Sequence, residues 1–182
     1  MRQQYRLAAF FIMTTLLLMA APLRGQEFTK LDPKLEGFRQ FIGKTWRGVL
    51  GEPGAKEPMV DVSHYERALN GTAIRVLHSI NDGSYGGESI IFWDKSKASL
   101  VFYYFTTAGF FTTGTMTMDG QSYTAHEFVS GNESGVTEVK STAVLGEDGK
   151  LRTKSEYFKN GEWVPGHSAV YEEATDAVVR FR

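Results

Sequence analysis

Four histidines are the side chains best suited to metal or proton chemistry in this sequence of 182 residues. They are His64, His78, His126 and His167. No two of them have the spacing that places a pair of imidazoles on one metal ion. His126 also alternates with threonines, a pattern typical of the solvated face of a strand. The sequence therefore predicts no metal site.

The residue patterns of nucleophilic catalysis are missing from the sequence. It has no cysteine, no G-x-S-x-G serine motif and no phosphate-binding P-loop. We therefore assign no catalytic residue, and the sequence leaves open whether the chain is an enzyme.

Two charged features have both a structural and a ligand-binding interpretation. Glu66 and Arg75 flank Asn70-Gly71 symmetrically, so they can form a cross-strand ion pair or anchor a ligand in a pocket. Glu127 lies in a strand-like segment on its apolar side. Because a buried carboxylate needs a partner or a raised pKa, Glu127 can orient a ligand, act as a general base, or pair with a lysine or a tyrosine hydroxyl.

Short strand-like runs bounded by turn signals must position these side chains. Asn70-Gly71, Asp119-Gly120 and Asn160-Gly161 are hairpin signals, and Asp148-Gly149 lies in a longer loop. The fold class predicted is all-β, a single up-and-down antiparallel β-barrel of about ten strands, because closing a long meander removes its exposed edges. The expected strands are 45–52, 58–69, 72–81, 85–93, 99–107, 110–118, 121–130, 136–146, 150–159 and 162–173.

One short helix is expected before the first strand. Asp32 is a suitable N-cap, Pro33 suits the first helical position, and Gly43 is placed to end the helix. Apolar residues recur between them at helical spacing. The helix, or a partner chain, is expected to cover an outer face of the barrel.

The register of the central hairpins predicts part of a pocket wall. With a two-residue loop at Asp119-Gly120, Met116 pairs with Tyr123, and Met116, Tyr123 and Glu127 point inward. A tight turn at Ala108-Gly109 adds Tyr103 and Phe105 to the inner wall. It leaves Phe102 and Tyr104 on the outer face, where they offer a surface for a homodimer.

The last hairpin has two alternative registers that differ by one residue. A two-residue turn at Asn160-Gly161 points Trp163, His167 and Tyr171 outward, whereas a loop of Lys159, Asn160 and Gly161 points them inward. The second register buries apolar rings and exposes charged residues, which favours it. It places Leu151, Tyr157, Trp163, His167, Ala169 and Tyr171 on one inner face.

Residues 1–25 have the pattern of a signal peptide, with a basic start, an apolar stretch and a cleavage zone between about residues 20 and 26. An uncleaved N-terminal anchor is the alternative. Export without cysteine suggests a bacterial periplasmic or secreted protein, with one domain over 26–182 and strands over about 45–173. The net charge of −1 predicts no nucleic-acid partner, and nothing implies an integral membrane partner.

The motifs FIGKTWRGVLGEPG, YERALNGTAIRV, IIFWDKSKASLVFYYFTTAG and GTMTMDG, in this order, resemble the lipocalin-like (calycin) barrels. Among these, the chain is similar to an exported bacterial family of unknown function, over about residues 38 to 173. The resemblance implies an internal pocket for a small, largely apolar ligand, with Trp46 as a structural plug at one end. Glu172 and Glu173 depart from the basic residue that often closes the last strand against this tryptophan. Relatives in the nitrobindin branch bind haem through a histidine near the end of the last strand, and His167 lies in the comparable place.

Three functions follow as hypotheses. The first is a binding barrel without catalysis for a small apolar or amphipathic molecule, with no cofactor expected. The second is a haem barrel acting on nitric oxide or its products. The third is a structural or partner-binding barrel filled by its own side chains, which a barrel of ten strands disfavours because it leaves more room than one of eight.

Overall fold

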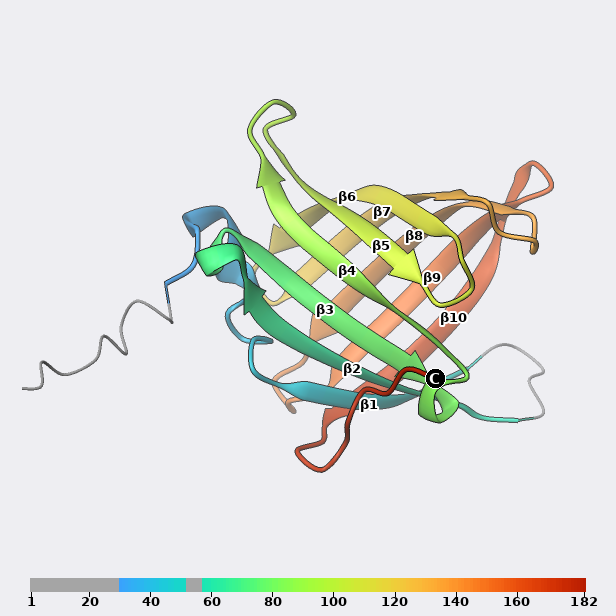
Figure 1. Cartoon of the computed structure of the whole chain (residues 1–182), viewed down its shortest axis with the longest axis horizontal. Helices are drawn as coiled ribbons and strands as arrows, with labels where there is room; N and C mark the ends of the chain where they lie inside the picture. Colours follow the sequence, from blue (N-terminus) through green and yellow to red (C-terminus); the bar gives the residue numbers. More distant parts are fainter. Residues whose placement is uncertain (1–29, 52–56) are drawn as a thin grey trace, which may run out of the picture.

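The computed structural model describes residues 30–51 and 57–182, so the expected signal peptide lies outside the described residues. Ten antiparallel strands form one closed barrel, in which each strand pairs with its sequence neighbours and β1 pairs with β10 (Figure 1). This confirms the predicted fold class. The strands are β1 (Thr45–Leu50), β2 (Met59–Ala68), β3 (Ala73–Ile80), β4 (Tyr85–Asp94), β5 (Ser99–Thr106), β6 (Phe111–Asp119), β7 (Ser122–Ser130), β8 (Val136–Leu145), β9 (Leu151–Lys159) and β10 (Glu162–Glu173).

The expected helix is a 3₁₀ helix, η2 (Pro33–Phe38), and it covers one end of the barrel (Figure 1). Asp32 caps it, since its Oδ1 accepts a hydrogen bond of 2.8 Å from the Lys34 backbone N–H. Phe38 and the following Phe41 are fully buried. The helix therefore plugs an end and does not cover the outer wall, contrary to the prediction. In the described part of the chain, no helix has the length and apolar character needed to cross a membrane.

Trp46, which the sequence predicts to plug one end of the barrel, is buried beside the helix segment. Its side chain is 1% exposed, and its ring centroid lies 6.1 Å from that of Phe41. Trp46 pairs with Glu173 across the closing strands. The basic group at this closure comes from Lys44. Its Nζ lies 5.6 Å from the centroid of the Trp46 ring and 3.0 Å from the Glu173 carboxylate. The acidic end of β10 thus closes against the tryptophan through a lysine of the segment before β1.

The β5–β6 hairpin has a longer loop than the sequence predicts. Phe105 pairs with Phe111, so five residues form the loop, and Thr106 Oγ1 donates a hydrogen bond of 2.8 Å to the Phe110 carbonyl. A loop of this length shifts the register by one residue, which exchanges the two faces of a strand. Tyr103 and Phe105 therefore lie on the outer face, 40% and 53% exposed.

Phe102 and Tyr104 consequently point inward, which contradicts their prediction as an outer dimer surface. Phe102 is 7% exposed and pairs with Gly114, and Tyr104 pairs with Thr112 on the inner wall. No homodimer can use these two rings while the barrel stays closed.

The register of the β6–β7 hairpin differs by two residues from the predicted one, but the inner and outer faces of both strands are as predicted. Met116 pairs with Ala125, and Met118 pairs with Tyr123, two positions from the predicted register. Because side chains alternate with a period of two, this displacement leaves every residue on its predicted face. The inward placement of Met116, Tyr123 and Glu127 is confirmed.

The β9–β10 hairpin begins with a two-residue turn. From the sequence, the longer loop is favoured because that loop buries more apolar rings. Lys159 pairs with Glu162, and Asn160 and Gly161 have φ of 54° and 85°, as a type I′ turn requires. Trp163 consequently pairs with Phe158 and is 37% exposed on the outer face, so its predicted inward position is wrong.

A bulge then reverses the faces of β10. The register shifts by one residue between Pro165 and Ser168, after which Ala169 pairs with Thr153 and Tyr171 with Leu151. Both Ala169 and Tyr171 are buried, as predicted. The residues Asn160 and Gly161 thus determine the type of turn, and the bulge returns the apolar side chains that follow it to the interior.

Candidate functional site

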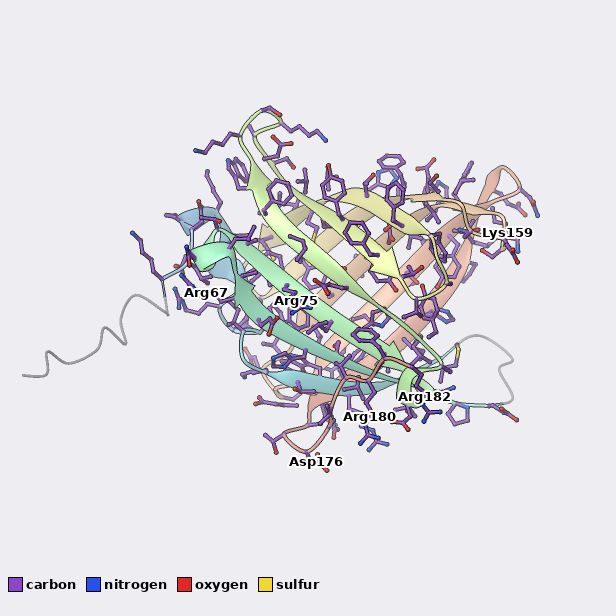
Figure 2. All side chains as sticks on the ribbon, viewed as in Figure 1. Arg67, Arg75, Lys159, Asp176, Arg180 and Arg182 are labelled. Carbon is purple, nitrogen blue, oxygen red and sulfur yellow. The ribbon has the colours of Figure 1, made fainter. Side chains whose placement is uncertain are left out.

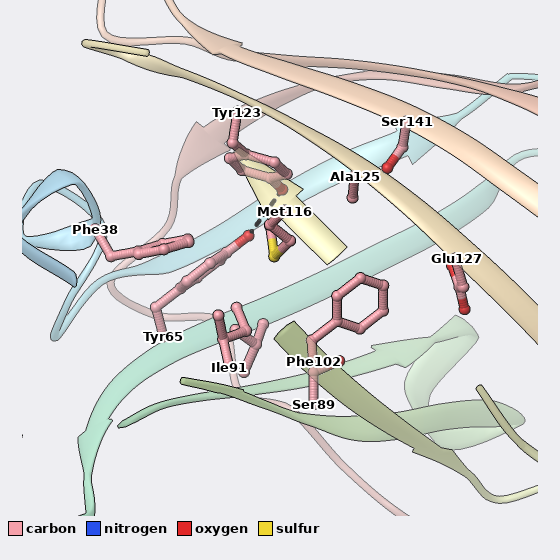
Figure 3. Close-up of a pocket in the computed structure, with 11 residues that line it drawn as sticks. Phe38, Tyr65, Ser89, Ile91, Phe102, Met116, Tyr123, Ala125, Glu127 and Ser141 are labelled. Atoms are coloured by element: carbon pink, nitrogen blue, oxygen red, sulfur yellow. Dashed lines mark hydrogen bonds between the residues drawn. The ribbon is translucent and has the colours of Figure 1, made fainter. Parts of the chain in front are cut away.

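The barrel interior contains a deep chamber next to the plugged end. It has a volume of about 180 Å³ and is lined by Phe38, Tyr65, Val76, Ser89, Ile91, Phe102, Met116, Tyr123, Ala125, Glu127 and Ser141. Figure 3 shows Phe102 and Met116 between the Tyr65–Tyr123 pair and Glu127. The two tyrosine oxygens lie 3.4 Å apart. Burial raises the pKa of both tyrosines, so their hydroxyls stay neutral.

A larger outer chamber of about 710 Å³ continues toward the opposite end of the barrel. Its wall comes mainly from β6 to β10 and includes Thr112, Val139, Ser155, Tyr157 and His167. Glu127 and Ser141 line both chambers. Figure 2 shows Arg67 at the plugged end and Lys159, which lines the outer chamber, at the other end.

Three large rings pack closely against glycines of neighbouring strands on the inner wall. A Cβ at Gly48 would lie 2.7 Å from the Tyr171 ring. A Cβ at Gly87 would lie 2.3 Å from the ring of Tyr104. A Cβ at Gly114 would lie 2.5 Å from the Phe102 ring. Glycine in a strand often marks such a close approach. Without these glycines the rings would have to turn toward the barrel axis and fill it.

The first two of these rings join a hydrogen-bonded belt across the inner wall. Tyr171, over Gly48, donates a hydrogen bond of 2.8 Å to Asp61 Oδ2. Asp61 Oδ1 lies 2.9 Å from His78 Nδ1, and His78 Nε2 lies 2.6 Å from the Tyr104 hydroxyl. The belt ends at Tyr85, whose hydroxyl is 3.1 Å from that of Tyr104. Asp61 is only 5% exposed, and these partners satisfy both of its oxygens.

Glu127 lies beyond the end of this belt. Thr112 donates a hydrogen bond to its Oε1. The barrel encloses the carboxyl while leaving it open to the chambers, and this burial raises the pKa of Glu127, an effect that Thr112 and the nearby His78 partly offset. The carboxyl of Glu127 thus has a pKa above its ordinary value and faces the space of both chambers.

The structure brings five of the eight predicted pocket residues to the chambers. These are Met116, Tyr123, Glu127, Tyr157 and His167, whereas Tyr103, Phe105 and Trp163 lie outside. His167 faces the ring of Tyr157, with centroids 5.7 Å apart and planes at 82°. Whether any of these residues binds a ligand remains a prediction.

Sequence reasoning missed the belt residues Asp61, His78, Tyr85 and Tyr104. The alternation of Asp61, Ser63 and Tyr65 in β2 was a signal, because these three share one face and all are buried. That the polar face is the inner one is visible only in the closed barrel.

Two other charged groups belong to the outer wall. Arg75 bonds Glu66 at 2.9 Å, as predicted, and Glu88 at 2.7 Å, and all three side chains are more than a third exposed. This location favours the ion-pair interpretation over a pocket anchor. His126 pairs with Glu138 at 2.7 Å, also on the outer wall. Within residues 30–51 and 57–182, no three His, Asp or Glu side chains form a group suited to a metal ion.

Comparison with known proteins supports the fold alone. No protein-family model matches the chain, and no curated protein matches it significantly in sequence. Among solved structures, the chain is similar to Rv2717c from M. tuberculosis, with a TM-score of 0.60 and 12% sequence identity. The match covers 80% of this chain and 99% of that one. At this identity the likeness establishes a shared barrel fold, and the chain is a closed antiparallel β-barrel of ten strands.

Proposed function

We propose that this protein binds a small amphipathic molecule inside its barrel. The observation that carries the proposal is the pair of adjacent chambers, of about 180 and 710 Å³, that share Glu127 in their walls. Ligand sites in proteins are concave, mostly apolar, and have volumes of about 300–1,000 Å³ with a few placed polar groups.

The distribution of side chains matches an amphipathic ligand. Both chambers combine apolar side chains with hydroxyl groups: Ile91, Phe102 and Met116 line the deep chamber together with tyrosine and serine hydroxyls, and the outer chamber has hydroxyl groups from serine, threonine and tyrosine beside its apolar side chains. The rings that lie on glycines keep this shape before any ligand arrives. A preformed site needs little reordering on binding, which favours affinity.

Met116→Arg tests the proposal, because Met116 lines the deep chamber and is 9% exposed. We expect the uncharged fluorescent dye N-phenyl-1-naphthylamine to bind the wild type, and its affinity to fall at least about tenfold in Met116→Arg, since an arginine would fill and charge the chamber. Thr117→Arg is the matched control, since Thr117 is the exposed neighbour on the outer face. Circular dichroism checks that both variants are folded. Equal dye binding by the two variants would contradict an internal site.

A second candidate function, haem binding, is favoured by the position of His167. An imidazole that faces a chamber is a common ligand of haem iron, and His167 lines the larger chamber beside Tyr157. The residues present fit this group: His167 would hold the iron, and Tyr157 would lie beside that histidine. A bound haem would supply an iron centre for small ligands such as nitric oxide.

Titration with haemin separates the two candidates. The haem function predicts a sharp Soret band that His167→Ala removes and His126→Ala retains, because His126 lies on the outer wall. Absence of the band in the wild type would dismiss haem and leave the amphipathic ligand as the proposed function.

A further inference from the structure

The deep end of the barrel is acidic. Of the described residues that line the deep chamber, Glu127 is the one carboxyl, and none is a lysine or an arginine. Two lysines line the outer chamber, Lys154 and Lys159, and both are exposed. An anionic group at the junction of the chambers would therefore meet a carboxyl and no deep basic partner.

Hydrogen-bond acceptors converge on the same junction. Thr112 and Ser141 border Glu127 on the neighbouring strands β6 and β8. Burial is the main cause of the raised pKa values of Tyr85 and Tyr104, and the charge of Glu127 adds to this effect. A primary ammonium group has three donors and no acceptor, so it suits a carboxylate surrounded by hydroxyl oxygens. Neighbouring aromatic faces also attract a cation.

The deep chamber has the size of one aromatic ring. An apolar cavity of about 150 Å³ is known to hold benzene. The deep chamber measures about 180 Å³ and has Ile91, Phe102 and Met116 in a wall that also carries tyrosine and serine hydroxyls. Because Glu127 lines this same chamber, a ring inside it and a polar group at Glu127 can belong to one short molecule.

We infer that the ligand is an amine with a compact apolar group, whose ammonium pairs with Glu127 while the apolar group occupies the deep chamber. This inference rests on the proposed function and names its ligand class. The pair would be an enclosed, charge-assisted hydrogen bond, which is stronger than a neutral one.

Binding of such an amine depends on pH in a defined direction. The titratable or charged groups that face Glu127 or line the same interior are Asp61, Tyr65, His78, Tyr85, Tyr104, Tyr123, Lys154, Tyr157, Lys159, His167 and Tyr171. Burial raises the pKa of Glu127, so the empty site holds its proton to a higher pH than an exposed glutamate. Amine affinity is therefore expected to rise as pH increases through this pKa, since only the ionised carboxylate attracts the ammonium.

Three probes with one skeleton test the inference by calorimetry at pH 7.5: 3-phenylpropylamine, 3-phenylpropan-1-ol and 3-phenylpropanoate. We expect the wild type to bind the amine about tenfold or more tightly than the alcohol, and the carboxylate most weakly. Glu127→Gln should lower amine affinity to that of the alcohol and leave the alcohol unchanged. Glu138→Gln is the matched control, because Glu138 is a carboxylate of the outer wall.

A second measurement avoids dependence on the folding of Glu127→Gln. In the wild type, amine affinity should rise with pH while alcohol affinity stays flat. If the alcohol or the dye binds but the amine has no advantage, the inference is overturned and the proposed function stands. If neither the dye nor any of the three probes binds, the proposed function fails, and the inference fails with it.

Discussion

Replacing Trp46 with alanine is expected to lower the free energy of unfolding by about 3–5 kcal/mol. The side chain is 1% exposed and packs on Phe41 at the plugged end of the barrel. Its removal leaves a cavity where β1 closes against β10, and it deprives Lys44 of the ring beneath its ammonium. Urea denaturation followed by far-UV circular dichroism measures the loss without relying on tryptophan fluorescence.

Trp163→Ala provides the matched comparison, because it makes the same substitution on the outer wall. Trp163 is 37% exposed and packs on Phe158, so we expect a loss of about 1 kcal/mol. Similar losses for the two variants would show that Trp46 is not the plug of the barrel.

Asp61→Ala is expected to have the second large effect, a loss of about 3 kcal/mol. It removes the acceptor of the Tyr171 hydroxyl and of His78 Nδ1 and leaves both groups without this partner inside the barrel. His78 would then no longer hold the Tyr104 hydroxyl in place, and the inner wall of the chamber would loosen. Thermal and urea unfolding measure the stability, and the dye titration reports on the chamber.

Two further substitutions serve as controls for Asp61→Ala. Asp61→Asn keeps an acceptor oxygen and should lose clearly less stability than Asp61→Ala. Asp148→Ala removes a carboxylate that pairs with Arg152 on the surface, and its effect should lie within the error of the measurement. If Asp61→Ala is as stable as the wild type, the belt does not hold the inner wall together.

The sequence by itself determined the number, order and approximate bounds of the strands. Asn70-Gly71, Asp119-Gly120 and Asn160-Gly161 each lie between paired strands, close to the expected positions. This information is local, because turn residues with positive φ and alternating side chains act within a few residues. Trp46 is buried, and its role as a plug of the barrel stays a prediction.

The central hairpin shows how much error in register the sequence reasoning can tolerate. The β6–β7 pairing lies two residues from its predicted position, yet Met116, Tyr123 and Glu127 are inward. In β5, a displacement of one residue exchanged Tyr103 for Tyr104 on the inner wall. Alternation identifies two faces of a strand, and loop length decides which one is inner.

Only the tertiary structure decided the site itself. Tyr171 reaches Asp61 over Gly48, and Tyr104 reaches His78 over Gly87, although Asp61 and Tyr171 are 110 positions apart in the chain. In β10, the bulge between Pro165 and Ser168 returned Tyr171 to the interior after a turn that points Trp163 outward. Barrel closure brings these residues together, because it joins the first and last strands and gives the side chains on one face of every strand a common interior.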